Sequence, residues 1–336
     1  MTVDAAEREF EASSGSRRVR THNPWLSFLR RRLIRFVVSL FVLVIASWGI
    51  VHAIPGDPVR AALGLKASPE LVEAKRHSLG LDQPILTQLW HYLGGLFSGN
   101  LGDSMVNNLP VSRTLGRLLP NTAVLVVLAF AVAILLSFPL GMLVGILTRD
   151  GRRPRTYLSF SAVTGLFGVI PDFLLGVGLV FLLAVTFTIF PVAGNAGISA
   201  YVLPIVALAA GPAALLARIV RVETQRVLGE EYMRIARAKR LPARILYLRH
   251  ALPNMLTASL TIGGLILSSL LAGTVLVETI FAWPGIGNLL VTSVLAKDYP
   301  TVQALALIFG GAALVINLLV DIVIALIDHR STIMDG

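Results

Sequence analysis

The sequence predicts an all-α integral membrane protein with six transmembrane helices, on three observations. Its 336 residues are 55% hydrophobic, and the mean hydropathy is +0.77. Only 14% of the residues are charged, against about 25% in an ordinary soluble domain. Several charge-free apolar runs have about 20 residues, the length that crosses roughly 30 Å of hydrocarbon as a helix. A large soluble core is therefore the weaker interpretation.

Five apolar runs predict five of the spans. Four of them cover residues 36–54, 121–148, 255–277 and 301–320, the last continuing past Asp321 to residue 327. The fifth covers residues 201–217 and is shorter, and it contains Pro204 and Pro212. Its continuation passes through Arg218, whose long side chain can reach the membrane interface.

Residues 156–190 contain a single charge, Asp172, and form either one long helix or two short spans. With one span here, segments 1–35, 149–155, 218–254 and 328–336 fall on one side and carry 22 of the 29 Lys and Arg residues. Such an excess marks the cytoplasmic side of a membrane protein. We therefore predict one third span kinked near Pro171 and both termini in the cytoplasm. This distribution explains the net charge of +10 without nucleic acid.

The segments outside the spans divide into three regions. Residues 1–30 are predicted to be a polar cytoplasmic tail, and residues 31–336 one membrane domain. Residues 55–120 are too long for a structureless loop, so we expect an external subdomain of short helices. In this subdomain Ser68 is a candidate helix cap and Gly80 a stop signal.

A basic loop at about residues 223–254 lies between the fourth and fifth predicted spans. Its part EEYMRIARAKRLPARILYLRHALPN, residues 230–254, carries six Lys or Arg. Helical spacing predicts one short helix before Arg240 and a second that begins at Pro242. Both helices are too polar to span a membrane, and composition alone leaves open that they adsorb on anionic membrane lipid.

This loop carries the pattern YxxxARAK followed by LRHAL, and further motifs accompany it in order along the chain. They are HAIPGDPV (52–59), GLDQP (80–84), GNLGDS (99–104), RLLPNT (117–122), VETIFAWPGIGNLL (277–290), KDYPTVQ (297–303) and NLLVDIVIALID (317–328). Together they resemble the permease subunits of ABC importers, in the dipeptide and oligopeptide branch. The resemblance covers roughly residues 33–330.

The resemblance implies a type I ABC-importer permease fold in a bacterial plasma (inner) membrane. It also implies four partners: a second homologous permease, two cytoplasmic ATPase subunits that hold ATP and magnesium, and an extracytoplasmic substrate-binding protein. The expected cargo is a dipeptide or oligopeptide, with nickel, a glutathione-like peptide or another small solute left open. In this family the basic loop seats in the ATPase, which implies these coupling residues: Tyr232, Ala236, Arg237, Ala238, Lys239, Arg240 and Leu241.

One position departs from the family pattern. Where the family usually has glycine after ARAK, this chain has Arg240. A side chain disfavours the positive φ that glycine permits, so we expect Pro242 to supply the break or the turn to use another geometry.

Polar residues within or beside the spans are candidate pathway or gate residues. Asp172 either lines the pathway or caps the half-helix after Pro171. Glu278 and Trp283 belong by resemblance to the external gate, although Glu278 alternatively is a plain helix-end carboxylate. Asn317 and Asp321 share one helix face, where we favour structural hydrogen bonds across helices.

The sequence shows no catalytic constellation. It contains no GxxxxGK[ST] phosphate loop, HExxH motif, GxSxG elbow or cysteine. We therefore expect no enzymatic activity, metal site or cofactor on this chain. The alternative hypothesis is an ion-coupled carrier in which Asp172, Glu278 and Asp321 are the coupling carboxylates.

Overall fold

The computed structural model describes residues 24–53, 57–64, 67–78 and 80–327. The predicted tail up to residue 23, residues 54–56 of the HAIPGDPV motif and the terminus 328–336 lie outside the described residues. Within the described residues all regular elements are helical. Among these described residues, five helices are long and apolar enough to span a membrane: α2 (Pro24–Ala53), α6 (Val111–Leu147), α9 (Ser199–Gly229), α12 (Leu252–Ile280) and α14 (Tyr299–Ile327).

The third predicted span is a broken pair of helices. α7 (Pro154–Val169) and α8 (Asp172–Leu179), which continues as the π-helical η2 (Val180–Thr186), meet at an angle of 97°. The pair brings the count to six spans if it crosses the membrane once. The break lies at the predicted place, because the residue before a proline avoids helical geometry and Ile170 is extended. It is far sharper than the kink we expected.

Two helix boundaries differ from the prediction. α2 begins at Pro24, ahead of the boundary expected at residue 30. α6 begins at Val111 and runs through Pro120, where the sequence had suggested that the external segment ends. Val111 and Leu115 are buried against Leu305 of α14 in a separate apolar cluster. Tertiary packing therefore holds a helix that the proline alone would interrupt.

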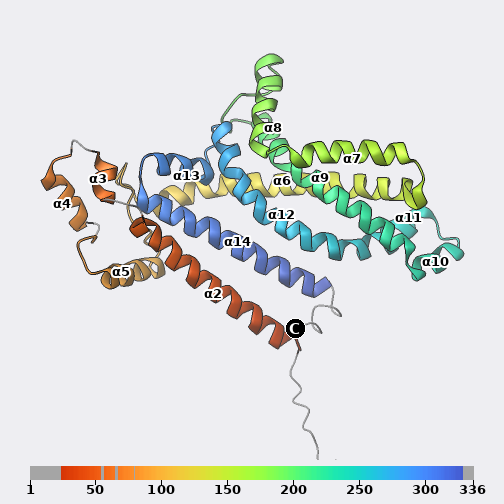
Figure 1. The fold of residues 1–336 in the computed structure, drawn as a ribbon, viewed down its shortest axis with the longest axis horizontal. Coiled ribbons are helices and arrows are strands. Elements are labelled where there is room, and N and C mark those ends of the chain that lie inside the picture. Colours follow the sequence, from red (N-terminus) through yellow and green to blue (C-terminus); the bar gives the residue numbers. More distant parts are fainter. Residues whose placement is uncertain (1–23, 54–56, 65–66, 79, 328–336) are drawn as a thin grey trace, which may run out of the picture.

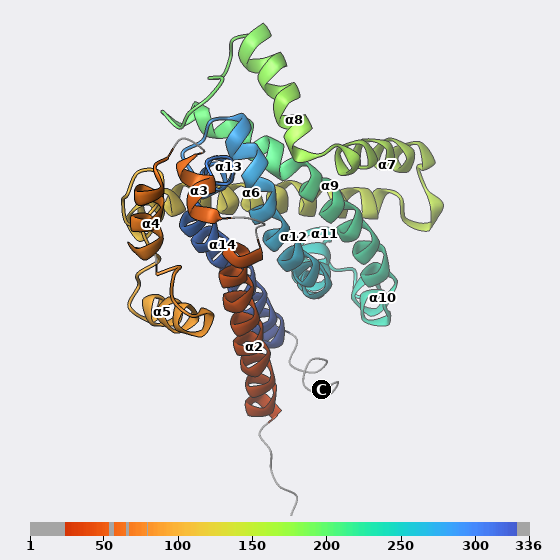
Figure 2. The same cartoon turned by 60° about the vertical axis from the view of Figure 1, so that its left-hand side comes forward.

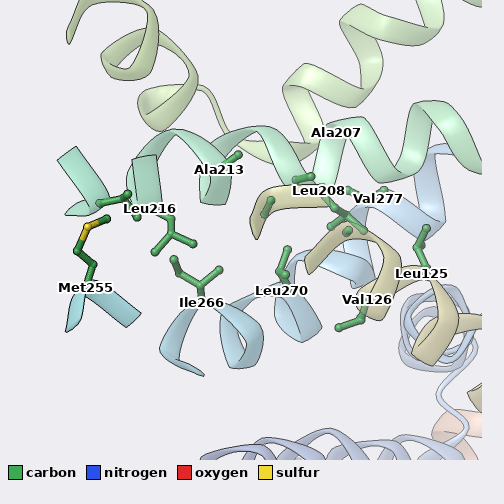
Figure 3. Packing of buried hydrophobic residues seen from close by; sticks show 14 of the residues in the cluster. Leu125, Val126, Ala207, Leu208, Ala213, Leu216, Met255, Ile266, Leu270 and Val277 are labelled. Atoms are coloured by element: carbon green, nitrogen blue, oxygen red, sulfur yellow. The ribbon is translucent and has the colours of Figure 1, made fainter. Parts of the chain in front are cut away.

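The main core lies between α6, α9 and α12. Figure 3 shows Leu125 and Val126 of α6 facing Leu208 of α9 and Leu270 of α12. α6 and α9 approach closely because Gly141 has no side chain at their contact. A Cβ atom placed on Gly141 would lie 2.5 Å from the carbonyl oxygen of Ala217.

The two regions outside the bundle lie at opposite ends of the molecule (Figure 1 and Figure 2). One end holds the predicted external subdomain, which contains α3 (Pro58–Leu63), α4 (Pro69–Ser78) and α5 (Ile85–Phe97). The other holds α10 (Glu231–Ala238) and α11 (Ala243–Ile245), which continues as η3 (Leu246–Ala251). The prediction of short helices in both regions is confirmed. Ser68 also caps α4 as expected, accepting a 3.2 Å hydrogen bond from the backbone N–H of Leu71.

Candidate functional site

The basic loop forms the predicted helix pair. α10 ends at Ala238, and Pro242 occupies the cap position before α11. Arg240 between them has a φ of 52°, in the left-handed region. Of the alternatives that the sequence left open, Pro242 supplies the break, and the turn does not use another geometry. The turn keeps the conformation that suits glycine, and its hydrogen bond from Arg240 N–H to the Arg237 carbonyl (2.9 Å) compensates part of the strain.

α10 is attached firmly to the end of α9. Met233 and Ala236 are buried in the main core cluster, with Ala236 only 7% exposed. The Arg237 guanidinium donates a 3.0 Å hydrogen bond to the carbonyl of Leu228, near the C-terminal end of α9. Polar and apolar contacts therefore both join α10 to the fourth predicted span.

The predicted coupling residues separate into a buried and an exposed set. Ala236 lies in the core, while Arg237 and Leu241 are half-buried. The exposed residues of the set are Tyr232, Ala238, Lys239 and Arg240. Sequence reasoning left three exposed apolar residues out of this set: Ile235 on α10, Ile245 on α11 and Leu248 on η3. Apolar residues that remain exposed beside a basic turn indicate a binding face. Helical periodicity alone would have placed these residues in a core.

Glu278 holds the N-terminus of α13 (Ile286–Leu295), a short helix that follows the turn at residues 281–285. Its fully buried carboxylate accepts hydrogen bonds from the backbone N–H groups of Gly287 (2.7 Å) and Asn288 (3.1 Å). The hydroxyl of Thr122 donates a third (2.6 Å) and itself accepts from the N–H of Ile286 (2.9 Å). Negative charge at a helix N-terminus is stabilising. Glu278 therefore joins α6, α12 and α13.

Trp283 lies in the interior rather than beside an opening. It is 0% exposed, and its ring meets Tyr201 edge-on with centroids 4.6 Å apart. Within the described part of the chain its indole N–H has no hydrogen-bond acceptor. The side chain of Asn121 donates a 2.7 Å hydrogen bond to the carbonyl of Pro284. The FAWPG turn is thus fastened to α6 and α9, the helices that build the core.

Asp172 is the first residue of α8, where that helix leaves the bundle. Its carboxylate faces two glycines: a Cβ atom on Gly273 of α12 would lie 3.0 Å from Oδ2, and one on Gly211 of α9 would lie 3.4 Å from Oδ1. α8 has no side-chain cap hydrogen bond, so the expected capping contact is absent. Asp172 is half-buried, and no side-chain hydrogen bond or ion pair to it is present within the described residues.

Asp321 and Asn317 each contact a different helix. Asp321 forms a 2.6 Å ion pair with Arg32 of α2. Asn317 accepts a 3.0 Å hydrogen bond from Ser268 of α12. The structural interpretation is thereby confirmed. The nearby Gly264 also packs within the chain, because a Cβ atom there would overlap Val320 of α14.

A network that sequence reasoning missed joins the predicted external subdomain to α14. Asp298 is buried and accepts hydrogen bonds from the hydroxyls of Ser104 (2.5 Å) and Thr301 (2.8 Å) and from the N–H of Met105 (2.8 Å). Ser104 and Asp298 belong to the GNLGDS and KDYPTVQ motifs, which are far apart in the sequence. Their joint presence is the only signal the sequence offered.

Comparisons with known proteins agree with this architecture. Residues 137–333 match the family described as binding-protein-dependent transport system inner membrane component, and residues 25–126 match the N-terminal family of the same systems. The chain is 37% identical over 303 residues to a glutathione transport system permease protein of Pectobacterium atrosepticum, covering 90% of this chain and 98% of that protein. The corresponding Escherichia coli K12 protein is 35% identical with the same coverage.

A solved structure shows the same fold. The inward-facing methionine ABC transporter MetNI contains a chain that superposes with a TM-score of 0.55 at 18% identity, covering 64% of this chain and 96% of that one. The match concerns the arrangement of helices alone. Taken with the family matches and the apolar helices, it shows a multi-pass inner-membrane protein with the ABC-importer permease fold. The chain belongs to the family of binding-protein-dependent transport system inner membrane components and is a permease of an ABC importer.

Proposed function

We propose that this chain forms half of the translocation pathway for short peptides, glutathione-like peptides included. Its partners are a second homologous permease, two ATPase subunits and an external binding protein. ATP and magnesium bind the ATPase subunits, and this chain has no catalytic activity of its own. Both termini lie in the cytoplasm.

The position of the α10–η3 pair carries this proposal. The pair projects at the end of the molecule opposite the short helices α3 to α5, so each end can meet a different soluble partner (Figure 2). α10 presents Tyr232, Ala238 and Lys239 to solvent while its other face is fixed to α9. A basic and partly apolar helix suits an anionic lipid surface as well as a protein. We assign it a protein partner because it is fixed to the end of α9 and projects from the end of the molecule (Figure 2).

The carrier hypothesis is less well supported by the contacts of the three carboxylates. Glu278 is bound by backbone amides and Thr122, and Asp321 is paired with Arg32. Neither faces an open path as a coupling group would. Asp172 is the one of the three without such a partner among the described residues, so we assign it to the pathway.

The substrate class rests on the relatives. The proteins at 35–37% identity are named for glutathione transport, and glutathione is itself a small peptide. A dipeptide or longer oligopeptide is compatible with the same permease, because specificity in such systems depends also on the binding protein. Nickel remains the alternative cargo, and it is less favoured because the described residues include no cluster of metal ligands.

The test is uptake by the complete complex in proteoliposomes. The chain would be purified in complex with a second permease, two ATPase subunits and a binding protein, and uptake of labelled glutathione, dipeptides and nickel would be compared. ATP-dependent uptake of a peptide is expected, and Asp172→Asn should change the preference among peptides of different charge. ATP hydrolysis or ion-driven uptake by the isolated chain would contradict the proposal.

A further inference from the structure

A cavity of about 420 Å³ opens between the predicted external subdomain and the outer ends of two long helices. α2 contributes Trp48 and His52, α5 contributes His91 and Tyr92, and α14 begins with Tyr299 in the wall. In Figure 1 these elements meet at the left of the molecule, away from α8. Asp172, Glu278 and Trp283 do not line it. The cavity is therefore separate from the gate network and from the assigned pathway residue.

Four of the motifs found in the sequence meet at this cavity. HAIPGDPV provides His52, GLDQP provides Gln83, GNLGDS provides Asn100, and KDYPTVQ provides Tyr299 and Gln303. The walls are held together independently of any ligand. The Ser104–Asp298 hydrogen bond joins the loop to α14, and Arg76 of α4 pairs with Asp57. The cavity is thus a built feature of the fold within the volume range of small-molecule sites.

The floor of the cavity is aromatic and apolar. Tyr299 is buried, while Trp48 and Tyr92 are half-buried. The Tyr92 hydroxyl is hydrogen bonded to Ser47 at 2.8 Å, which fixes its ring in place. Aromatic rings with one polar edge bind ligands that are themselves partly apolar and partly polar.

The polar lining consists of amides, imidazoles and the hydroxyls of Ser78, Tyr92 and Tyr299, and none of the lining residues is an Asp, Glu, Lys or Arg. Gln88 is the centre of one group: its Nε2 donates to the Gln83 carbonyl (2.7 Å), and its Oε1 lies 3.0 Å from His52 Nε2. The Gln83 side-chain oxygen is buried and has no hydrogen-bond partner among the described residues. A buried acceptor without a donor is unfavourable, and the terminal side-chain torsion of glutamine is soft enough to turn it toward a ligand.

We propose that this cavity binds a short peptide by hydrogen bonds to the amide groups of the peptide. An apolar side chain of the peptide would lie against the Trp48, Tyr92 and Tyr299 rings. The peptide amide both donates and accepts hydrogen bonds, so it matches a lining of carboxamides, imidazoles and hydroxyls. Among the described residues, the one lining residue in an ion pair, His77, is neutralised by Asp82, so the lining favours the peptide group over a strongly charged solute. The site lies outside the pathway, where it would retain peptide close to the permease. The choice of peptide rests on the proposed function.

The experiment uses the full-length chain in lipid nanodiscs and the labelled probe N-acetyl-phenylalanyl-glycinamide, which has peptide groups but no charged ends. Equilibrium dialysis should show saturable binding. Ser78 is an exposed lining residue whose hydroxyl bonds only the Lys75 carbonyl, so Ser78→Trp should fill the cavity without unfolding the chain. It should weaken binding about tenfold or more, because the indole ring would occupy the space of the peptide and remove its contacts with the cavity.

Leu71→Trp is the matched control, because Leu71 is exposed on the same helix and does not line the cavity. It should leave binding unchanged, while His91→Leu should weaken it about threefold or more. Absence of saturable binding, binding that Ser78→Trp does not alter, or binding that needs the binding protein would each overturn the inference. Peptide uptake by the complex without binding at the cavity would leave the proposed function standing. If Ser78→Trp weakens binding but the complex transports no peptide, the site is supported and the proposed function is contradicted.

Discussion

The hydroxyl of Ser104 donates a 2.5 Å hydrogen bond to the carboxylate of Asp298, 194 residues later in the chain. This contact and the Met105 N–H to Asp298 bond attach the loop after α5 to the start of α14. Both Ser104 and Asp298 are buried, so water does not replace the lost bond when one partner is removed.

Ser104→Ala should lower the free energy of unfolding by about 1–2 kcal/mol, and Asp298→Ala by about 2–4 kcal/mol because three donors lose their acceptor. Thermal unfolding of the purified chain in detergent measures both. Ser98→Ala is the control, since the Ser98 hydroxyl is exposed and contacts only its own helix. Equal melting temperatures for all three variants would show that this network does not attach the subdomain.

Glu278→Gln should destabilise the outer end of the bundle by about 1–3 kcal/mol, because one amide group would place a donor against the backbone N–H groups of α13. Thr122→Val should have a similar effect, since Thr122 connects Glu278 to Ile286. Hydrogen exchange of the α13 amides would report local loosening. Thr279→Val, an exposed neighbour with only a local hydrogen bond, should leave that exchange unchanged; loosening of the same size there would contradict the assignment.

The pair of His77 and Asp82 should make the turn between α4 and α5 pH-dependent. His77 Nδ1 donates a 2.7 Å hydrogen bond to the carboxylate of Asp82. This bond, together with the Asp82 charge, raises the pKa of His77, and the same bond lowers the pKa of Asp82. The stability that His77 contributes to the turn is fully present below its ordinary pKa near 6.5, and it is lost as pH rises through the raised pKa. The stability that Asp82 contributes is fully present above its ordinary pKa near 3.8, and it is lost as pH falls through the lowered pKa.

The turn should therefore be most protected from hydrogen exchange between about pH 4 and 6.5. His77→Gln should remove the loss of protection on the alkaline side. Both side chains are on the surface, so the effect should be local and should weaken at high salt. A pH profile that stays the same in His77→Gln would assign the dependence to other groups.

Arg240→Gly should preserve the turn between α10 and α11 and stabilise it by up to about 1 kcal/mol, since glycine adopts a φ of 52° without a Cβ clash. Part of this gain is offset by the larger conformational entropy of glycine in the unfolded chain. Lys239→Gly is the matched control, because Lys239 has a φ of −72° and glycine would relieve no backbone strain there. It should lose about 1 kcal/mol in the same unfolding measurement. A loss in Arg240→Gly would show that its side chain is needed.

Local patterns predicted the elements of the fold better than they predicted its contacts. The apolar runs located the spans, and Pro171 and Pro242 located two helix breaks. Both kinds of feature depend only on residues that are neighbours in the sequence. Pro120 misled the prediction, since packing of Val111 against α14 maintains the helix through it.

The partners of the polar residues were beyond such patterns. Glu278 is bound by Thr122, 156 residues away, and Asp321 by Arg32. Periodicity places a residue on a helix face and does not say which distant helix lies opposite it. The motif series indicated that these residues matter. Only the three-dimensional arrangement distinguishes a paired carboxylate from Asp172, which has no partner within the part of the chain that the structure describes.

Ala238→Trp should uncouple the permease from its ATPases without disturbing the fold. Ala238 is the last residue of α10 and is exposed, whereas Ala236 on the same helix is buried in the core. A bulky side chain at Ala238 would therefore prevent a partner protein from docking closely. Ala236→Trp should instead overpack the core and separate α10 from α9. Lys239→Ala should have a smaller effect, because an exposed ion pair contributes only about 0–1 kcal/mol.

The measurement is ATP hydrolysis by the reconstituted complex, with and without loaded binding protein, together with retention of the ATPases on the tagged permease. Ala238→Trp should reduce stimulated hydrolysis and substrate uptake together while the melting temperature of the isolated chain stays unchanged. Ala236→Trp should lower that melting temperature. Because the two positions lie on one helix and differ in burial, the pair separates a docking defect from a folding defect. Normal stimulation in Ala238→Trp would place the coupling surface elsewhere, with the exposed Ile235 and Leu248 as the next residues to substitute.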